Sequence, residues 1–306
     1  MTTLAGVVRL GTRASRLARF QTDLVRQTLA GLHRTIEFQT VVISTEGDRD
    51  VRTPLPEIGG KGVFTQELEA ALREGAIDLA VHSLKDVPVE PSAGLTLGAI
   101  GLREDPRDVL ISGRGWTLGM LPREAVVATC STRRAAQLRA IRPDLRLVPL
   151  RGNVDTRVGK ALAEEFDGIV IAAAGVHRLG LAFAITQYLP PEVMLPAPGQ
   201  GALALQCRAD DEPMLEQLRR LENAAVRSAT DAERGFLEGL GGGCAAPIAA
   251  LGRVQNGRLH LQGLVASIDG RQQLRIAADG AADDGRRLGL TLAAEARARG
   301  AEALLG

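Results

Sequence analysis

Arginine residues gather in one part of the chain, between residues 133 and 157. This segment holds seven arginines but only two acidic residues, Asp144 and Asp155, so its local net charge is +5. A guanidinium is a planar, permanently charged donor that pairs bidentately with carboxylate and phosphate groups. The segment therefore indicates a carboxylate or phosphate site, with ordinary surface charge as the alternative. We expect Arg139, Arg142 and Arg146 on a solvated face, whereas four others lie beside strand-to-helix turns and should converge on one sheet edge: Arg133, Arg134, Arg151 and Arg157.

The N-terminal third offers similar groups, each a cation beside a strand-to-helix turn. Arg13 is followed by Ser15, a predicted N-cap for a helix over residues 16–30, because its hydroxyl can accept an orphan backbone N–H. Lys61 lies in a glycine-rich segment just before a helix predicted over residues 63–74, and helix N-termini favour anions. Neither segment has the P-loop spacing, so nucleotide binding is unsupported.

Lys85 and Asp86 follow a buried strand predicted over residues 77–81. Ligands of α/β sheets gather at the carboxyl ends of strands, which makes this pair a candidate for chemistry. An ionised aspartate in a cleft could stabilise a cationic intermediate and relay protons. A purely structural ion pair is the alternative that these two residues leave open.

Cys244 follows three glycines, where little bulk shields its sulfur and the backbone has unusual freedom. This setting favours a reactive thiol that could attach a group, although a free cysteine is more often a small buried apolar residue. The latter is expected for Cys207, which lies within a predicted strand. Three cysteines without a C-x-x-C motif indicate neither a disulfide framework nor a thiolate metal site, so no metal is expected and a reducing cytosol fits.

Short β-branched runs alternate with helical patterns through the first two thirds of the chain, a pattern typical of βαβ units around mainly parallel sheets. A length of 306 residues favours two or three domains. We predict strands over 7–10, 37–43, 77–81, 109–112, 125–129, 145–150, 168–172 and 202–208. Further helices are predicted over 132–141 and 154–164, and over 212–240 with a break near Asn223. The remainder indicates a small α+β unit, with strands over 248–253, 259–266 and 272–277 and a helix over 284–299.

The overall composition excludes several classes of protein. Thirty-seven basic residues stand against thirty-six acidic ones, and aromatics make up 3%, so neither a chain-wide field nor stacking platforms recruit nucleic acid. The most apolar run, residues 168–176, is far too short for a membrane span. The N-terminal residues lack a signal-peptide pattern. We therefore expect no nucleic-acid partner, no membrane partner and a cytoplasmic location.

Seven short motifs occur along nearly the whole chain and together resemble the porphobilinogen deaminases, also called hydroxymethylbilane synthases. Their combination is far more specific than any one of them. In this sequence they read Leu10–Ser15, Gly59–Phe64, Val81–Pro88, Arg103–Asp108, Leu150–Val154, Gly199–Ala202 and Gly242–Cys244. The segment before the paired arginines departs from the common family pattern at Cys130 and Thr132, and Arg52 departs from it in the preceding loop.

The resemblance implies an α/β fold with two periplasmic-binding-protein-like domains and a smaller C-terminal α+β domain. The chain is then expected to return to the first domain after the second, with a crossing near residues 195–201. The expected boundaries are 1–101 with 202–219 for the first domain, 102–201 for the second and 220–306 for the third. A monomer is the expected state.

The resemblance also implies an enzyme that joins four porphobilinogen molecules head to tail, releasing ammonia each time, to give the linear tetrapyrrole hydroxymethylbilane. It implies a dipyrromethane cofactor held by a thioether to Cys244. Asp86 matches the catalytic aspartate, which stabilises the cationic azafulvene and the charged pyrrole. Positions that match cofactor- or substrate-binding residues, or the loop over the cleft, are Arg13, Ser15, Lys61, Phe64, Ser83, Lys85, Thr129, Ser131, Arg133, Arg134, Arg151, Arg157 and Gln200.

Two other classes of function are weighed against this enzyme. A non-catalytic small-anion binding protein could use the same two-domain architecture. The lack of an export signal and the Gly-Gly-Gly-Cys turn argue against it. Nucleic-acid binding through the basic segment is opposed by the scarce aromatics and the balanced charge.

Overall fold

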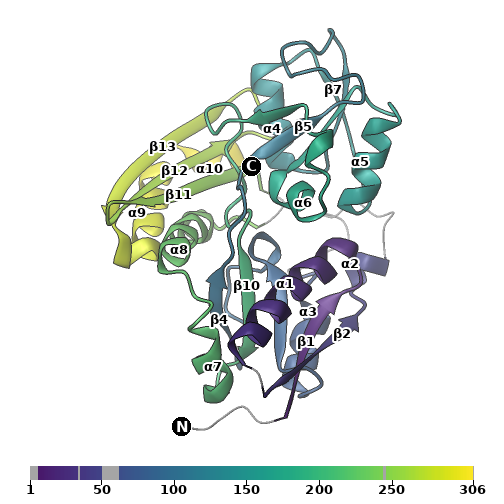
Figure 1. Cartoon of the computed structure of the whole chain (residues 1–306). Coiled ribbons are helices and arrows are strands. Elements are labelled where there is room, and N and C mark those ends of the chain that lie inside the picture. The colour runs from purple at the N-terminus through teal and green to yellow at the C-terminus, as the bar shows by residue number, and fades with distance from the viewer. Residues whose placement is uncertain (1–5, 34, 50–61, 244–245, 306) are drawn as a thin grey trace.

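The computed structural model describes residues 6–33, 35–49, 62–243 and 246–305, which form three sheets with surrounding helices (Figure 1). Lys61 and Cys244 lie outside the described residues. The predicted fold class, two α/β units and a smaller α+β unit, is confirmed. The domain boundaries given above stay a proposal.

The first sheet contains five strands in the order β2-β1-β3-β10-β4. Its apolar residues, among them Leu10, Leu79 and Leu205, form a core with Val25 and Leu29 of the first helix. The strands are β1 (Val7–Arg13), β2 (Glu37–Ile43), β3 (Leu79–Ser83), β4 (Leu95–Gly101) and β10 (Leu203–Arg208).

The second sheet repeats this plan in the order β7-β6-β8-β5-β9. Its interior is almost entirely aliphatic, as the low aromatic content requires, with Val109, Ile169 and Ile171 at its centre. The strands are β5 (Asp108–Ile111), β6 (Val126–Ala128), β7 (Arg146–Val148), β8 (Gly168–Ala172) and β9 (Gln187–Leu189).

Four of the five strands in each large sheet run in the same direction, as expected for mainly parallel sheets, and one strand in each runs against the others. β10 pairs antiparallel with both β3 and β4, and β5 pairs antiparallel with both β8 and β9. Each of these strands enters its sheet directly after the chain has crossed from the other sheet. β10 thereby lies between two strands of the first sheet although it follows the whole second sheet in sequence, and it places Ala204 opposite His82 near the carboxyl end of β3.

The helices around the two large sheets mostly begin where the sequence indicates. The side chain of Ser15 accepts a hydrogen bond from the Ala18 N–H, as expected for the N-cap. The helix expected from residue 63 begins only at Gln66, because Gly62, with φ +87°, forms a turn whose carbonyl accepts from the Thr65 and Gln66 N–H groups. The helices are α1 (Arg16–Leu32), α2 (Glu46–Arg49), α3 (Gln66–Arg73), α4 (Thr132–Ile141), α5 (Val154–Leu162) and α6 (Ala173–Arg178).

The C-terminal unit packs a three-stranded antiparallel sheet against two helices (Figure 1). Phe236 is fully buried in its core, and a Cβ at Gly263 would lie 2.5 Å from the Phe236 ring, so glycine there lets the ring approach the sheet. Asn223 caps the second helix at the predicted break. The elements of this unit are α8 (Ala224–Gly239), β11 (Ile248–Gln255), β12 (Arg258–Ala266), β13 (Gln273–Ala281), α9 (Gly285–Ala298) and α10 (Ala301–Leu305). The preceding helix, α7 (Glu212–Leu218), packs instead on the first sheet, where Met214 and Leu218 join the core.

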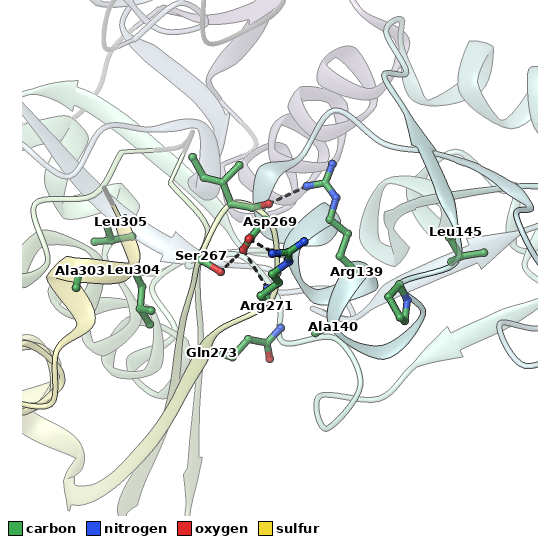
Figure 2. Close-up of a pocket in the computed structure, with 13 residues that line it drawn as sticks. Arg139, Ala140, Leu145, Ser267, Asp269, Arg271, Gln273, Ala303, Leu304 and Leu305 are labelled. Atoms are coloured by element: carbon green, nitrogen blue, oxygen red, sulfur yellow. Dashed lines mark hydrogen bonds and ion pairs between the residues drawn. The ribbon is translucent and has the colours of Figure 1, made fainter.

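A groove of about 1140 Å³ is lined by the C-terminal end of α4, the turn between β12 and β13, and α10 (Figure 2). Arg139 crosses it by donating to the Ile268 carbonyl at 2.8 Å. Gly270, with φ +74°, lets the turn pack directly on the backbone of α4 at Ala136. The small unit therefore fixes the position of α4.

A buried carboxylate joins the C-terminal unit to both chain crossings. Glu233 of α8 is fully buried and pairs with Arg103 at 2.8 Å. Its carboxylate also accepts from the Gly199 N–H at 2.6 Å and the Gly252 N–H at 2.8 Å. Burial raises the pKa of Glu233, and the Arg103 guanidinium opposes that rise. Arg103 lies in the outgoing crossing and Gly199 in the returning one, so a single side chain holds both.

We expect Arg103→Ala to lower the free energy of unfolding by about 3–5 kcal/mol, because it leaves the Glu233 carboxylate buried without its counter-charge. The control is Arg286→Ala, which breaks an exposed ion pair with Glu238 and should cost less than about 1 kcal/mol. Urea denaturation of both variants measures the two losses. Equal losses would show that Arg103 is no more important than a surface ion pair.

Candidate active site

A short 3₁₀ turn, Leu84–Asp86, follows β3 and presents Lys85 and Asp86. Leu84 is fully buried, its N–H donates to the Ala202 carbonyl at 3.0 Å, and its carbonyl accepts from the Val87 N–H at 3.1 Å. The apolar side chain therefore anchors the turn. The two polar neighbours stay partly exposed beside the end of the strand.

Ser83, the last residue of β3, is held by a partner that the sequence did not indicate. The amide of Gln21, on α1, donates to the Ser83 hydroxyl at 2.9 Å. Gln21 is buried, so its amide is committed to this contact. The signal that could have found it is a glutamine one turn into the helix that Ser15 caps, on the face toward β3.

Behind the turn lies a buried polar chain that reaches β10. His82 contacts the Gln206 side-chain oxygen through Nε2 at 3.1 Å, and the Gln206 amide donates to Glu69 at 3.2 Å. Burial lowers the pKa of His82 to about 4, so the ring is neutral at pH 7. Because Gln206 donates to Glu69 through its nitrogen, its oxygen accepts from His82 Nε2–H.

Lys85 lies within electrostatic reach of charges from the second sheet. Burial lowers the pKa of Lys85 to about 8, Asp86 and Asp108 oppose this shift, and Arg134 and Arg133 add to it. Asp108 and the two arginines belong to β5 and α4. The structure thus brings residues from the two large sheets together at one site.

Arg13 and Phe64 pack together on the first sheet. The guanidinium carbon of Arg13 lies 3.9 Å from the centre of the Phe64 ring, a cation–π contact. The contact joins the end of β1 to the turn that precedes α3.

The N-terminus of α4 is built from hydroxyl side chains. Ser131 caps the helix by accepting from the Arg134 N–H, and its own N–H donates to the Thr129 hydroxyl at 3.2 Å. Thr129 itself is buried. Both predicted hydroxyl residues therefore shape the local backbone that presents the paired arginines.

Asp108 is the residue on which the paired arginines converge. Its two carboxylate oxygens accept from Arg133 at 2.8 Å and Arg134 at 2.7 Å, and the Gln200 amide donates to it at 2.9 Å. Burial alone raises the pKa of Asp108, but the two guanidinium groups outweigh burial and hold it well below its ordinary value. Arg133 also donates to the Leu195 carbonyl at 2.6 Å. Arg134 bonds within the protein as well, through Nε and Nη2 to Asp108 and through Nη1 to the Val170 carbonyl at 3.3 Å, so Arg133, Arg134 and Gln200 are all engaged inside the protein.

Arg151 and Arg157 lie at the next strand-to-helix turn of the second sheet. Arg157 donates to the Gly152 carbonyl at 2.7 Å. Burial lowers the pKa of Arg157, and the neighbouring Arg134 and Arg151 charges lower it further, while Asp86 opposes the shift. Three arginines thus lie close enough to repel one another. Asp86 of the first sheet lies within reach of the same group.

The other three arginines of the basic segment serve different surroundings. Arg142 pairs with Asp144 at 2.7 Å and donates to carbonyls of the preceding loop, and Arg139 bridges the groove described above. Arg146 is exposed. Arg142 therefore holds the preceding loop in place, and the expectation that it lies on a solvated face is wrong.

The site as a whole carries an excess of positive charge in a partly buried place. Arg13, Lys85, Arg134, Arg151 and Arg157 outnumber the two carboxylates nearby, and both Lys85 and Arg157 have pKa values lowered by burial and by like charges. An anion placed among them would offset the repulsion between the cations and raise the pKa values of Lys85 and Arg157 again. Guanidinium forks at several strand-to-helix turns fit a ligand with several carboxylates.

Comparison with known proteins identifies such a ligand. A family model for the dipyrromethane cofactor-binding domain of porphobilinogen deaminase matches residues 8–216, and a model for the C-terminal domain of porphobilinogen deaminase matches residues 228–298. The chain belongs to the porphobilinogen deaminase family. Members of this family are transferases of tetrapyrrole biosynthesis that act on porphobilinogen, and the cofactor is a dipyrromethane.

Individual relatives agree over nearly the whole chain. The porphobilinogen deaminase of Roseiflexus sp. (strain RS-1) is 48% identical over 97% of each chain. The porphobilinogen deaminase of Brevibacillus brevis (strain 47 / JCM 6285 / NBRC 100599) is 46% identical over 97% of this chain and 96% of its own length. That of Syntrophomonas wolfei subsp. wolfei (strain DSM 2245B / Goettingen) is 44% identical over 97% of each.

The described part of the chain has neither a membrane-spanning helix nor a cluster of metal-ligating side chains. None of its helices combines the length and apolar character needed to cross a membrane. Within the same residues, no group of three or more histidine, cysteine, aspartate or glutamate side chains could hold a metal ion.

The Asp108 carboxylate should make stability depend on pH in a defined way. The folded-state pKa of Asp108 is well below the ordinary 3.8, so its contribution to stability is present above the ordinary value and is lost below it, as the pH falls toward the lowered folded-state pKa. We expect Asp108→Asn to lower the free energy of unfolding by about 3–5 kcal/mol at pH 7, because two guanidinium groups lose their counter-charge. The difference in the free energy of unfolding between Asp108→Asn and the unmutated protein should stay constant down to about pH 5 and become smaller at lower pH. Urea denaturation across this range measures it, and a gap that widens on acidification would contradict the assignment.

Proposed function

We propose that the site between the two large sheets joins four porphobilinogen molecules head to tail, releasing ammonia at each addition, to give hydroxymethylbilane. The observation that carries this proposal is that Asp86 lies within electrostatic reach of Arg157, across the two sheets. One carboxylate beside several guanidinium groups suits a substrate whose arms are acidic and whose ring becomes positively charged.

The donor set fits a dipyrromethane, whose rings carry acetate and propionate arms. When bound, this cofactor supplies the pyrrole end to which the first substrate unit is joined. We assign the binding of its acid groups, and those of the substrate, to the cations and their hydroxyl neighbours. These are Arg13, Ser15, Lys61, Ser83, Lys85, Thr129, Ser131, Arg134, Arg151 and Arg157, with Phe64 as the surface beneath Arg13.

Arg133 and Gln200 contribute to this site through Asp108. Their side chains contact its carboxylate at 2.8 and 2.9 Å. They thereby fix the position of the Arg134 guanidinium, which shares the same carboxylate. We propose Cys244 as the attachment point of the cofactor, at the end of the glycine segment that follows α8.

Asp86 is proposed to stabilise the positive charge that develops on the pyrrole ring and to accept a hydrogen bond from the ring N–H. A carboxylate already held in place near developing charge lowers the barrier without reorganising at the moment of reaction. Lys85, beside it, supplies a cation for an acid arm on the same ring. The alternative of a non-catalytic anion-binding protein is not favoured by the family membership.

The same proposal covers the oligomeric state of the protein, its location in the cell and its partners. We propose a monomer that acts in the cytoplasm on a small-molecule substrate, without a nucleic-acid or membrane partner. The balanced charge of the chain supports the absence of a nucleic-acid partner.

Asp86→Asn tests the role of the carboxylate. The variant keeps the size and hydrogen-bonding shape of the side chain but loses its charge, so it should fold and carry its cofactor yet lose nearly all turnover. Ammonia release from porphobilinogen measures turnover, and intact-protein mass confirms that the cofactor is present. Turnover like that of the unmutated protein would remove Asp86 from this role.

Cys244→Ala tests the attachment point. The unmutated protein should carry a covalent adduct with the mass of two pyrrole units, and the variant should lack it. Cys130→Ala and Cys207→Ala are the matched controls, because Cys207 is buried in β10 and Cys130 contacts the backbone of Leu150 at 2.9 Å. An adduct retained in Cys244→Ala, or lost in a control, would contradict the proposal.

A further inference from the structure

Arg234, on α8, contacts the backbone immediately after Asp86. Its Nη1 donates to the Val87 carbonyl at 2.9 Å and its Nη2 donates to the Pro88 carbonyl at 2.7 Å. One guanidinium thus holds two consecutive peptide units through its fork. Hydrogen bonds from a charged donor are stronger than those between neutral groups, and two of them from one planar group fix direction as well as distance.

The contact completes the anchoring of the Asp86 turn. On the near side the turn is held by the buried Leu84 side chain and by the Val87 N–H to Leu84 carbonyl bond. On the far side the chain continues into Pro88 and Val89, and Arg234 ties the Val87 and Pro88 carbonyls to the C-terminal unit. Without this tie the far side of the turn would gain freedom just where the carboxylate is presented.

The neighbouring residue of α8 holds the other flank of the same turn. Glu233 accepts from the Gly199 N–H, and Gly199, with φ +75°, packs on Leu84 and Lys85. A Cβ at Gly199 would lie 2.9 Å from Leu84 Cγ and 3.3 Å from the backbone nitrogen of Lys85. Two consecutive side chains of one helix therefore reach both flanks of the turn that carries Lys85 and Asp86.

The same helix leads directly to the proposed attachment point. α8 ends at Gly239, five residues before Cys244. A helix is a stiff element, so the contact at Arg234 relates the position of Asp86 to the start of the segment that bears the cysteine. Figure 1 shows α8 between the three-stranded sheet and the first sheet.

We propose that Arg234 is a positioning residue for the reaction, which sets the place of Asp86 relative to the rings held on Cys244. This inference rests on the proposed function, because it takes Asp86 as the group that stabilises the positive ring. Arg234 acts through the Val87 and Pro88 backbone and does not itself contact the substrate. Misplacing a reacting group by about 1 Å can cost about 100-fold in rate.

The test compares Arg234→Ala and Arg234→Lys with a matched control on the same helix. Arg227 also ties α8 to the first sheet, by donating to the Leu97 carbonyl at 3.0 Å, but this contact is on β4 and away from the Asp86 turn. Arg227 also pairs with Glu222 at 2.8 Å, so Arg227→Ala removes a tether together with an ion pair, without touching the turn. Cofactor loading of all variants is measured by intact mass before the kinetics.

We expect Arg234→Ala to load its cofactor and to lose about 10- to 100-fold in kcat, with a much smaller change in KM. Amide hydrogen exchange should become faster at Lys85, Asp86 and Val87, which is a readout independent of turnover. Arg234→Lys should recover part of kcat because one charged donor remains. Arg227→Ala should keep kcat and leave exchange in the turn unchanged.

Three results would overturn the inference. One is an unchanged kcat in Arg234→Ala; the second is an equal loss of kcat in Arg227→Ala; the third is failure of Arg234→Ala to load its cofactor. Failure of the proposed function gives a different pattern, because Asp86→Asn would then retain turnover whatever Arg234 does. Loss of turnover in Asp86→Asn together with an unchanged Arg234→Ala would reject the positioning role alone.

Discussion

The structure depends on how the charge of buried guanidinium groups is balanced. The first turn of α4 carries Arg133 and Arg134 at the positive end of the helix dipole, which is unfavourable without a nearby anion. Asp108 supplies one negative charge for both, so the pair remains net positive. Because Arg133 and Gln200 hold that carboxylate in place, the remaining positive charge has a fixed position. A carboxylate ligand would neutralise the positive charge that Asp108 leaves on the two arginines.

The same crossing segment that helps to hold Asp108 also takes part in the second buried carboxylate. Gln200 donates to Asp108, and the preceding residue, Gly199, donates to Glu233. Arg103 links the two by pairing with Glu233 and donating to the Gln200 carbonyl at 3.2 Å. The charged groups of the second sheet and the helix of the C-terminal unit are therefore joined through two adjacent residues. These hydrogen bonds and ion pairs fix the position of the charged groups at the site, although they bury little surface.

Local signals in the sequence predicted elements whose ends are set by neighbouring residues. The bounds of α4, β2 and β8 match the prediction, and so do the cap at Ser15 and the helix break near Asn223, because capping and apolar periodicity act within a few residues. β4, α6 and β9 were missed, and so was the insertion of β10 between β3 and β4. The roles of Asp108 and Gln21 were missed for the same reason, since their partners lie 25 or more residues away. Residue type and strand-end position indicated where cations would meet, but not which of them the protein would neutralise itself.

Burial among like charges also explains why arginine suits this site better than lysine. In these surroundings the pKa of Lys85 falls to about 8, which brings its charge close to the physiological range. The pKa of Arg157 is lowered by the same kinds of cause, but a guanidinium starts so high that it remains charged. Carboxylates bound beside Lys85 would raise its pKa again, so ligand binding and protonation of this lysine support each other. A site that must hold several acid groups at once can therefore rely on arginine for constant charge, with a single lysine whose charge the ligand itself secures.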